Sequence, residues 1–188
     1  MIKFRKSKVG RYMHYFLAIS LPNELKKQLH SFISEWKAPF RLFVHEEDYH
    51  ITLAFLGRAT EEERKQIAEY MPKVVRKHRA FSLQLSEVYS FGSRILWYGV
   101  KEESRLFSLR QDVYDVCRQI GFSLDARPFT PHITLAKKWN GSFPFSLETY
   151  PRKIEGEDIR FFVHDVVLYE THMDQTPKYK PLMRFPLS

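Results

Sequence analysis

The sequence contains one pentapeptide twice, and this repeat constrains the fold more than any other feature. His-Ile-Thr-Leu-Ala occupies residues 50–54 and recurs at residues 132–136 of the 188-residue chain. Five identical residues in two segments of so short a chain are improbable by chance. The repeat predicts two related lobes, each contributing one equivalent strand.

Strand geometry indicates what each copy does. Side chains alternate between the two faces of a strand, so His50 and Thr52 project together, while Ile51 and Leu53 project oppositely. The same holds for residues 132–135. Each copy therefore offers an apolar pair to a core and a polar pair to the other side. Two such strands brought together would line a cleft with two imidazoles and two hydroxyls.

These side chains suit a phosphate ester. Imidazole has its ordinary pKa close to neutrality, so one histidine can be protonated while its twin is not, and an anionic substrate between them favours that division. The neutral ring can take a proton from water, and the charged ring can give one to the departing oxygen. The hydroxyls of Thr52 and Thr134 can donate to the non-bridging phosphate oxygens. No metal is needed for this chemistry.

Other interpretations of the repeat stay open. Its histidines and threonines could cap backbone groups or fill polar gaps, although the duplication favours a shared function. A metal site would need further ligands, and neither copy contains an acidic residue or a second histidine. A serine nucleophile is disfavoured because the sequence has no GxSxG segment.

The remaining pattern predicts an α+β fold with antiparallel elements rather than regular strand–helix alternation. Thr60 and Glu63 form a capping-box pattern at a helix start, Pro72 should bend or end that helix, and Gly121 suits a helix end. No glycine-rich phosphate loop is present. Helices are expected at residues 23–36, 60–78 and 104–120, and strands at 12–21, 43–56, 81–88, 94–100, 129–138, 161–169 and 182–187.

Composition sets broader limits. Thirty Lys and Arg against 22 Asp and Glu give a net charge of +8, which suits a polyanionic partner or simply a basic surface. The single cysteine, Cys117, excludes an internal disulfide, is expected to be buried in its helix, and suggests a cytoplasmic location. No apolar run is long enough for a membrane span. Residues 1–8 are interpreted as a short flexible lead-in.

At the two His-Ile-Thr-Leu segments the sequence resembles the 2H phosphoesterase superfamily, whose signature is a pair of HxTx motifs. It is most similar to the branch of bacterial RNA 2',3'-cyclic phosphodiesterases, also described as 2'-5' RNA ligase-like. The resemblance covers nearly the whole chain. The segments that carry it are residues 16–22, 50–57, 94–100, 127–132, 168–170 and 184–187.

The resemblance implies a single bilobal domain over residues 1–188, with two pseudo-symmetric lobes of antiparallel sheet backed by helices. One motif lies in each lobe (50–53 and 132–135), and the active cleft lies between them. It also implies hydrolysis of RNA 2',3'-cyclic phosphate ends to 2'-phosphates without metal or cofactor. His50 would be the proton donor, His132 the proton acceptor, and Thr52 and Thr134 the phosphate-binding residues. RNA ligation through a 2'-5' linkage, or binding of RNA ends without turnover, remain alternatives.

One position departs from the family. Arginine commonly follows the second motif, whereas this chain has Lys137 and then Lys138. Strict alternation places residue 137 away from Thr134 and residue 138 with it. Lysine keeps the charge but loses the bidentate guanidinium geometry. Lys137 and Arg127 are candidates for contacts to RNA phosphates, and Phe129 for stacking on a base. No obligate protein partner is indicated, so a monomer is expected.

Overall fold

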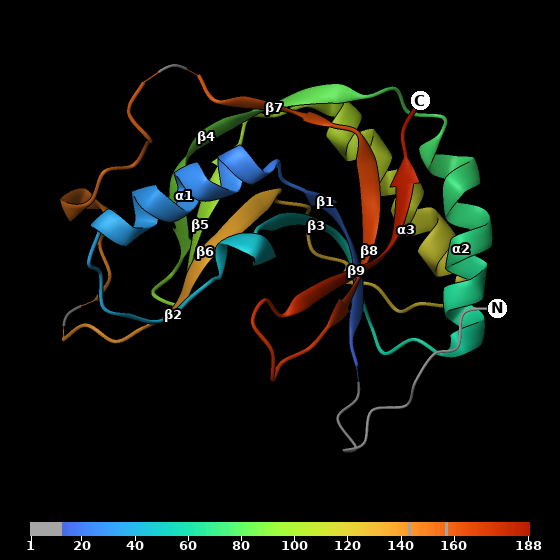
Figure 1. The fold of residues 1–188 in the computed structure, drawn as a ribbon, viewed down its shortest axis with the longest axis horizontal. Helices are drawn as coiled ribbons and strands as arrows, with labels where there is room; N and C mark the ends of the chain where they lie inside the picture. The colour runs from blue at the N-terminus through green and yellow to red at the C-terminus, as the bar shows by residue number, and fades with distance from the viewer. Residues whose placement is uncertain (1–12, 143, 157) are drawn as a thin grey trace.

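The computed structural model describes residues 13–142, 144–156 and 158–188, which form an α+β fold (Figure 1). In this part of the chain nine strands make one antiparallel sheet in the order β7-β4-β5-β6-β3-β1-β8-β9, and β2 also pairs with β6. The strands are β1 (Tyr15–Ser20), β2 (Phe40–Phe43), β3 (His50–Gly57), β4 (Phe81–Phe91), β5 (Ile95–Val100), β6 (His132–Trp139), β7 (Arg160–Val163), β8 (Asp165–Thr171) and β9 (Tyr179–Pro186). The fold class expected from the sequence is confirmed.

The two repeated segments lie side by side at the middle of the sheet. They form β3 and β6, which pair antiparallel with Ile51 opposite Ile133. Because equivalent residues of the repeat oppose each other in an antiparallel pair, a local twofold relation passes between them. Ile51 and Ile133 are both fully buried, so the repeat's apolar face belongs to the core, as alternation predicts.

Each repeated strand carries a β-bulge at the same place. Leu53 is an extra residue in β3 relative to β1, and Leu135 is an extra residue in β6 relative to β5. A bulge inserts one residue and reverses the alternation beyond it. Lys137 therefore faces the same side as Thr134, and the expectation that it faces away was wrong. Lys138 has a positive φ of 62° and is exposed.

The two halves of the sheet are joined by a segment expected to be one strand. Residues 161–169 instead form parts of β7 and β8, which are separated at His164 and pair with β4 and β1, respectively. The aromatic and aliphatic run continues through His164, so the pattern gives no sign of the break. The sheet is consequently curled, and Figure 1 shows β7 passing over the top of the molecule into β8.

Two other strand predictions were too long. The stretch predicted at 43–56 contains the end of β2, a short 3-10 turn at Glu46–Asp48 and β3. His45 Nδ1 accepts a hydrogen bond from the backbone N–H of Glu47 and caps that turn. The strand predicted from residue 129 begins only at His132, because Pro128 and Pro131 have no N–H to donate to a sheet.

Three α-helices in the described residues support the sheet: α1 (Asn23–Glu35), α2 (Glu61–Val75) and α3 (Ser104–Ile120). The capping box of Thr60 and Glu63 is present at the start of α2. Pro72 lies in the last turn of that helix, which ends three residues before the predicted His78. Gly121 ends α3 with a φ of 114°, a conformation that favours glycine.

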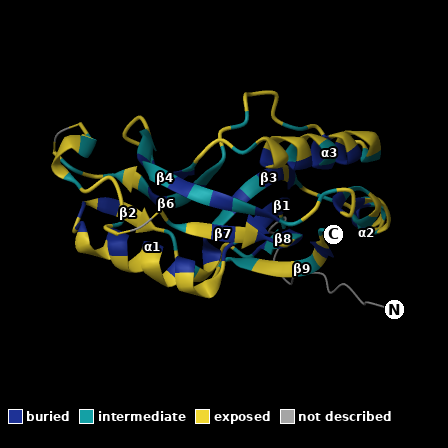
Figure 2. Ribbon diagram, turned by 90° about the horizontal axis from the view of Figure 1, so that it is seen from above, coloured by how far each residue is buried: buried dark blue, intermediate teal, exposed yellow. Residues whose placement is uncertain are grey.

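The helices divide between the two halves of the sheet. In Figure 1, α2 and α3 lie side by side over the half that contains β3, β8 and β9, while α1 crosses the half that contains β2 and β6. Figure 2 shows their exposed outer faces, with the buried residues turned toward the sheet. Cys117 on α3 is fully buried as expected, and burial raises the pKa of its thiol to about 12.

Two other observations complete the fold. The lead-in proposed for residues 1–8 lies outside the described residues. Among those that are described, no helix is both long and apolar enough to cross a membrane.

Candidate active site

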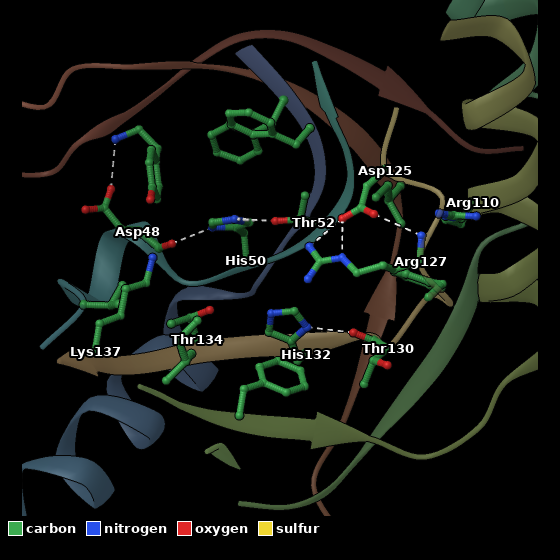
Figure 3. A pocket seen from close by; sticks show the side chains of 18 of the residues that line it. Asp48, His50, Thr52, Arg110, Asp125, Arg127, Thr130, His132, Thr134 and Lys137 are labelled. Atoms are coloured by element: carbon green, nitrogen blue, oxygen red, sulfur yellow. Dashed lines mark hydrogen bonds and ion pairs between the residues drawn. The ribbon is translucent and has the colours of Figure 1, made fainter. Parts of the chain in front are cut away.

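A cavity of about 830 Å³ opens where β3 and β6 meet (Figure 3). His50 and Thr52 line it from β3, and His132 and Thr134 line it from β6. The other three residues singled out from the sequence, Arg127, Phe129 and Lys137, line it as well. Thus the structure brings all seven predicted site residues to one cavity.

His50 is held by two hydrogen bonds from its own neighbourhood. Its Nδ1 lies 2.7 Å from the backbone carbonyl of Asp48, and its Nε2 lies 2.9 Å from Thr52 Oγ1. A carbonyl can only accept, so Nδ1 carries the hydrogen. In the neutral ring, Nε2 then accepts from the threonine hydroxyl. The ring packs 4.8 Å from Phe16 and 5.2 Å from Tyr179, measured between centroids.

His132 is oriented by the equivalent backbone contact. Its Nδ1 lies 2.7 Å from the carbonyl of Thr130, two residues before it in the chain. Nδ1 therefore carries the hydrogen here too, and Nε2 is the atom available to a ligand. Phe91 and Trp97 pack against this ring, with centroid distances of 5.3 and 5.6 Å.

The four polar side chains alternate around the cavity. Figure 3 shows His50 on the side of Thr134, and Thr52 on the side of His132. This follows from the antiparallel pairing of Ile51 with Ile133, because one residue on from that pair a histidine of one strand comes opposite a threonine of the other. An anion between the strands would meet one imidazole and one hydroxyl from each half.

The surroundings lower the proton affinity of both histidines. Burial lowers the pKa of His50 to about 4; the carbonyl of Asp48 opposes this shift, and the charge of Lys137 adds to it. Burial, with the charge of Lys137, also lowers the pKa of His132. Both rings are thus neutral at pH 7 without a ligand. A bound anion would raise both pKa values by favouring the charged ring.

Two basic residues lie toward opposite ends of the cavity. Lys137 lies on the side of Asp48 in Figure 3, and Arg127 lies on the side of Thr130. Burial, and then the charge of Lys178, lowers the pKa of Lys137. Arg127 is exposed and pairs with Asp125, with its Nε 2.8 Å from Oδ2. The arginine lowers the pKa of Asp125 to about 2.

Asp48 is a site residue that sequence reasoning missed. It is only 4% exposed, and its carboxylate accepts hydrogen bonds from the backbone N–H groups of Lys178 and Tyr179 at 2.9 to 3.0 Å. Its own carbonyl orients His50. One residue therefore attaches the loop before β9 to the first motif. Its partners lie about 130 residues away in the chain, so no local pattern could indicate this role.

The described residues contain no group of three or more His, Cys, Asp or Glu side chains placed to hold a metal ion.

Two histidine–threonine pairs that face one cavity on a curled antiparallel sheet define the 2H phosphoesterase class of fold and site. Residues 21–175 match the model of the 2'-5' RNA ligase superfamily. The chain belongs to that superfamily.

Relatives with assigned names agree with this membership. An RNA 2',3'-cyclic phosphodiesterase of Geobacillus stearothermophilus is 47% identical over 180 residues, which are 93% of this chain but 57% of that protein. This chain thus spans little more than half of that relative. An RNA 2',3'-cyclic phosphodiesterase of Bacillus subtilis is 30% identical over 180 residues, 93% of this chain and 97% of that protein.

Solved structures share the fold. The crystal structure of Escherichia coli LigT complexed with 3'-AMP superposes with a TM-score of 0.82 at 26% identity and covers 95% of this chain and 99% of that one. A structure from Thermus thermophilus, TT0787, has a TM-score of 0.76 at 21% identity, covers 92% of this chain and 97% of that one, and supports the fold alone.

Proposed function

We propose that this chain is a metal-independent RNA 2',3'-cyclic phosphodiesterase that converts cyclic ends to 2'-phosphomonoesters. The observation that carries the proposal is the pair of imidazoles in one cavity. Each has Nδ1 bound to a carbonyl, which leaves Nε2 as the atom for proton transfer, although in His50 this Nε2 also accepts from Thr52 Oγ1. The names of the relatives from Geobacillus and Bacillus support the same substrate class.

In the proposed reaction, His132 Nε2 takes a proton from a water molecule as that water attacks the phosphorus. The bond from phosphorus to O3' breaks, and His50 Nε2 gives its proton to O3'. The product is a 2'-phosphate with a free 3'-hydroxyl. Thr52 and Thr134 donate hydrogen bonds to the non-bridging oxygens as negative charge increases on them. The donor and acceptor roles follow the convention of the family.

The histidine that acts as the acid must take up a proton from solvent when the anionic substrate binds. Both histidines are neutral in the empty cavity, because burial lowers the pKa of each. A phosphodiester anion between the rings offsets the cost of charging one of them, and binding therefore prepares the acid–base pair. Lys137 and Arg127 supply positive charge at either end of the cavity, and Phe129 offers a ring to a base.

The surrounding organisation is proposed as follows. The two halves of the sheet act as one bilobal domain over residues 1–188, with one motif in each lobe and no obligate protein partner. The single buried cysteine suits a reducing, cytoplasmic compartment.

The test is product analysis with a short RNA that carries a 2',3'-cyclic phosphate, in the presence of EDTA. We expect a 2'-phosphate product at an undiminished rate. Adding a second RNA with a 5'-hydroxyl end measures ligation, in which that hydroxyl attacks the phosphorus in place of water and O3' leaves. A joined product in excess of the hydrolysed one would replace hydrolysis by ligation. Binding without either product would replace catalysis by an RNA-end binding role.

A further inference from the structure

Helix α3 presents a row of alternating aromatic and basic side chains beside its buried face. Phe107, Arg110, Tyr114 and Arg118, here called the α3 stripe, follow each other at spacings of three or four residues. Such spacing places them along one side of a helix. Tyr114 is 5% exposed and belongs to the core together with Leu109, Val113 and Cys117, whereas Phe107 and Arg118 are exposed.

The members of the stripe stack on one another. The guanidinium carbon of Arg110 lies 3.3 Å from the ring centroid of Tyr114 and 5.2 Å from that of Phe129. Phe107 packs against Phe129 at 5.4 Å, and Arg118 lies 5.5 Å from Tyr114. The result is a continuous stack of rings and guanidinium groups, with Tyr114 buried and the exposed surface at Phe107 and Arg118.

This surface is continuous with the candidate active site. Arg110, Tyr114 and Phe129 line the same cavity as the two histidines. Figure 3 shows Arg110 beyond Arg127, at the end of the cavity away from Lys137. The hydroxyl of Tyr114 donates to the carbonyl of Asp125 at 3.1 Å and holds the segment that precedes β6 against the helix. The stripe is therefore a built extension of the cavity.

The arginines of the stripe make no close ion pair with the described carboxylates, although the charge of Arg110 helps to lower the pKa of Asp125. Within the described residues neither Arg110 nor Arg118 takes part in an ion pair, and Arg110 Nε is buried without a hydrogen-bond partner. The nearby carboxylate of Asp125 is already bound by Arg127. Basic groups interleaved with aromatic rings suit single-stranded nucleic acid, because phosphates pair with the cations and bases stack on the rings.

We propose that the α3 stripe and Phe129 bind the RNA strand on the 5' side of the cyclic end, so that oligonucleotide ends are preferred over cyclic mononucleotides. This inference rests on the proposed phosphodiesterase function. A mononucleotide occupies the cavity around the histidines and leaves Phe107 and Arg118, which lie outside it, without a contact. A longer strand gains stacking and phosphate contacts on the helix.

The test compares kcat/KM for 2',3'-cyclic AMP and for a hexameric oligoadenylate with a 2',3'-cyclic end. The variants are Phe107→Ala and Arg118→Gln, with Phe162→Ala and Arg160→Gln as matched controls. Both control residues are exposed on β7 and do not line the cavity. Loss of one stacked base corresponds to about tenfold. We expect kcat/KM for the hexamer to fall about tenfold in Phe107→Ala, with that for cyclic AMP unchanged.

Salt dependence gives a second readout that a folding defect would not mimic. Arg118→Gln should reduce the slope of log binding affinity for the hexamer against log salt concentration by about 0.7, the value for one phosphate contact on a single strand. Arg118→Lys, which keeps the charge, should retain the slope. Arg118 is exposed, so its replacement leaves the core intact.

The two proposals fail in different ways. A wild-type protein that hydrolyses neither substrate would overturn the phosphodiesterase function itself. A wild-type protein that hydrolyses both with equal kcat/KM would overturn only the proposed RNA-binding role of the α3 stripe. So would stripe variants that match the β7 controls, or that lower activity on both substrates equally.

Discussion

The two His-Ile-Thr-Leu segments have the same sequence but different surroundings. His50 is covered by Phe16 and Tyr179, and its Nε2 is bound to Thr52. His132 packs against Phe91 and Trp97 at the other side of the cavity. In both, the carbonyl two residues earlier binds Nδ1 at 2.7 Å. The backbone just before each repeat thus sets the orientation of its imidazole, whereas residues from elsewhere set how strongly each ring resists protonation.

The position after the shared pentapeptide makes the two halves chemically different. The equivalent bulges at Leu53 and Leu135 turn Phe55 and Lys137 into the same cavity. One half therefore contributes a ring that is 54% exposed, and the other contributes an ammonium group. The repeat thus provides two equivalent positions that face the cavity, and only the one occupied by Lys137 carries a charge.

The largest effect should come from removing either imidazole. His50→Ala and His132→Ala should each lower kcat by about 10²–10⁴, the usual contribution of a general acid or base. The double variant should lose less than the product of the two, because the pair acts as a unit. Steady-state hydrolysis of a cyclic-ended RNA measures both, with His30→Ala on the exposed side of α1 as a control. Full activity in either single variant would contradict the shared mechanism.

The next largest effect should be a loss of stability on replacing Asp48, but not on replacing Thr130. These two residues hold equivalent positions, two before each histidine. Asp48→Ala leaves two partly buried backbone N–H groups without their acceptor, and hydrogen bonds to charged groups contribute about 1.5–3 kcal/mol each. We expect the free energy of unfolding to fall by about 3 kcal/mol in urea titrations. Thr130→Ala is the matched control, since Thr130 is exposed and its backbone carbonyl, which binds His132, is retained. Equal stability of the two variants would show that Asp48 does not attach the loop before β9.

The sequence predicts local features of the site but not its contacts between distant segments. The shared face of His50 and Thr52 follows from the period of a strand, and the limits of α3 follow from its apolar spacing and Gly121. Such features depend on residues within a few positions of one another. The contact between Asp48 and Tyr179 depends on chain segments 131 residues apart, and nothing local reports it.

The β-bulges could be predicted only in part, because a bulge is a local feature that depends on a neighbouring strand. Each depends on how a repeated strand pairs with a neighbour, β1 for Leu53 and β5 for Leu135. Pairing is not visible in the alternation of one strand, so alternation placed Lys137 on the wrong face. The break at His164 was missed for the same reason, because it is set by the change of partner from β4 to β1.

The low pKa of His50 predicts a specific dependence of stability on pH. The pKa of His50 is about 4 in the folded chain and 6.5 in the unfolded one, so between these values the unfolded chain binds more protons. The free energy of unfolding therefore falls as pH decreases from 6.5 to 4, by at most about 3 kcal/mol from this residue. Urea titrations of wild type and His50→Gln across this range measure the difference. A parallel pH dependence in the two proteins would contradict the low pKa.

The smallest effect should come from Lys137, which takes the place of Phe55 in the second half of the site. Lys137→Met removes the charge beside both imidazoles, which should raise the pKa of each, since Lys137 now lowers both. It also removes the proposed contact to a substrate phosphate, so KM should rise about tenfold, as expected for roughly 1.4 kcal/mol of binding. Lys137→Arg restores the charge and adds a bidentate donor, so KM should stay within about threefold of wild type. Histidine titrations by NMR, together with steady-state kinetics, separate these effects. If Lys137→Met changed neither KM nor the histidine titrations, the bulge at Leu135 would have no consequence for the site. The positions of Phe55 and Lys137 would then be functionally equal.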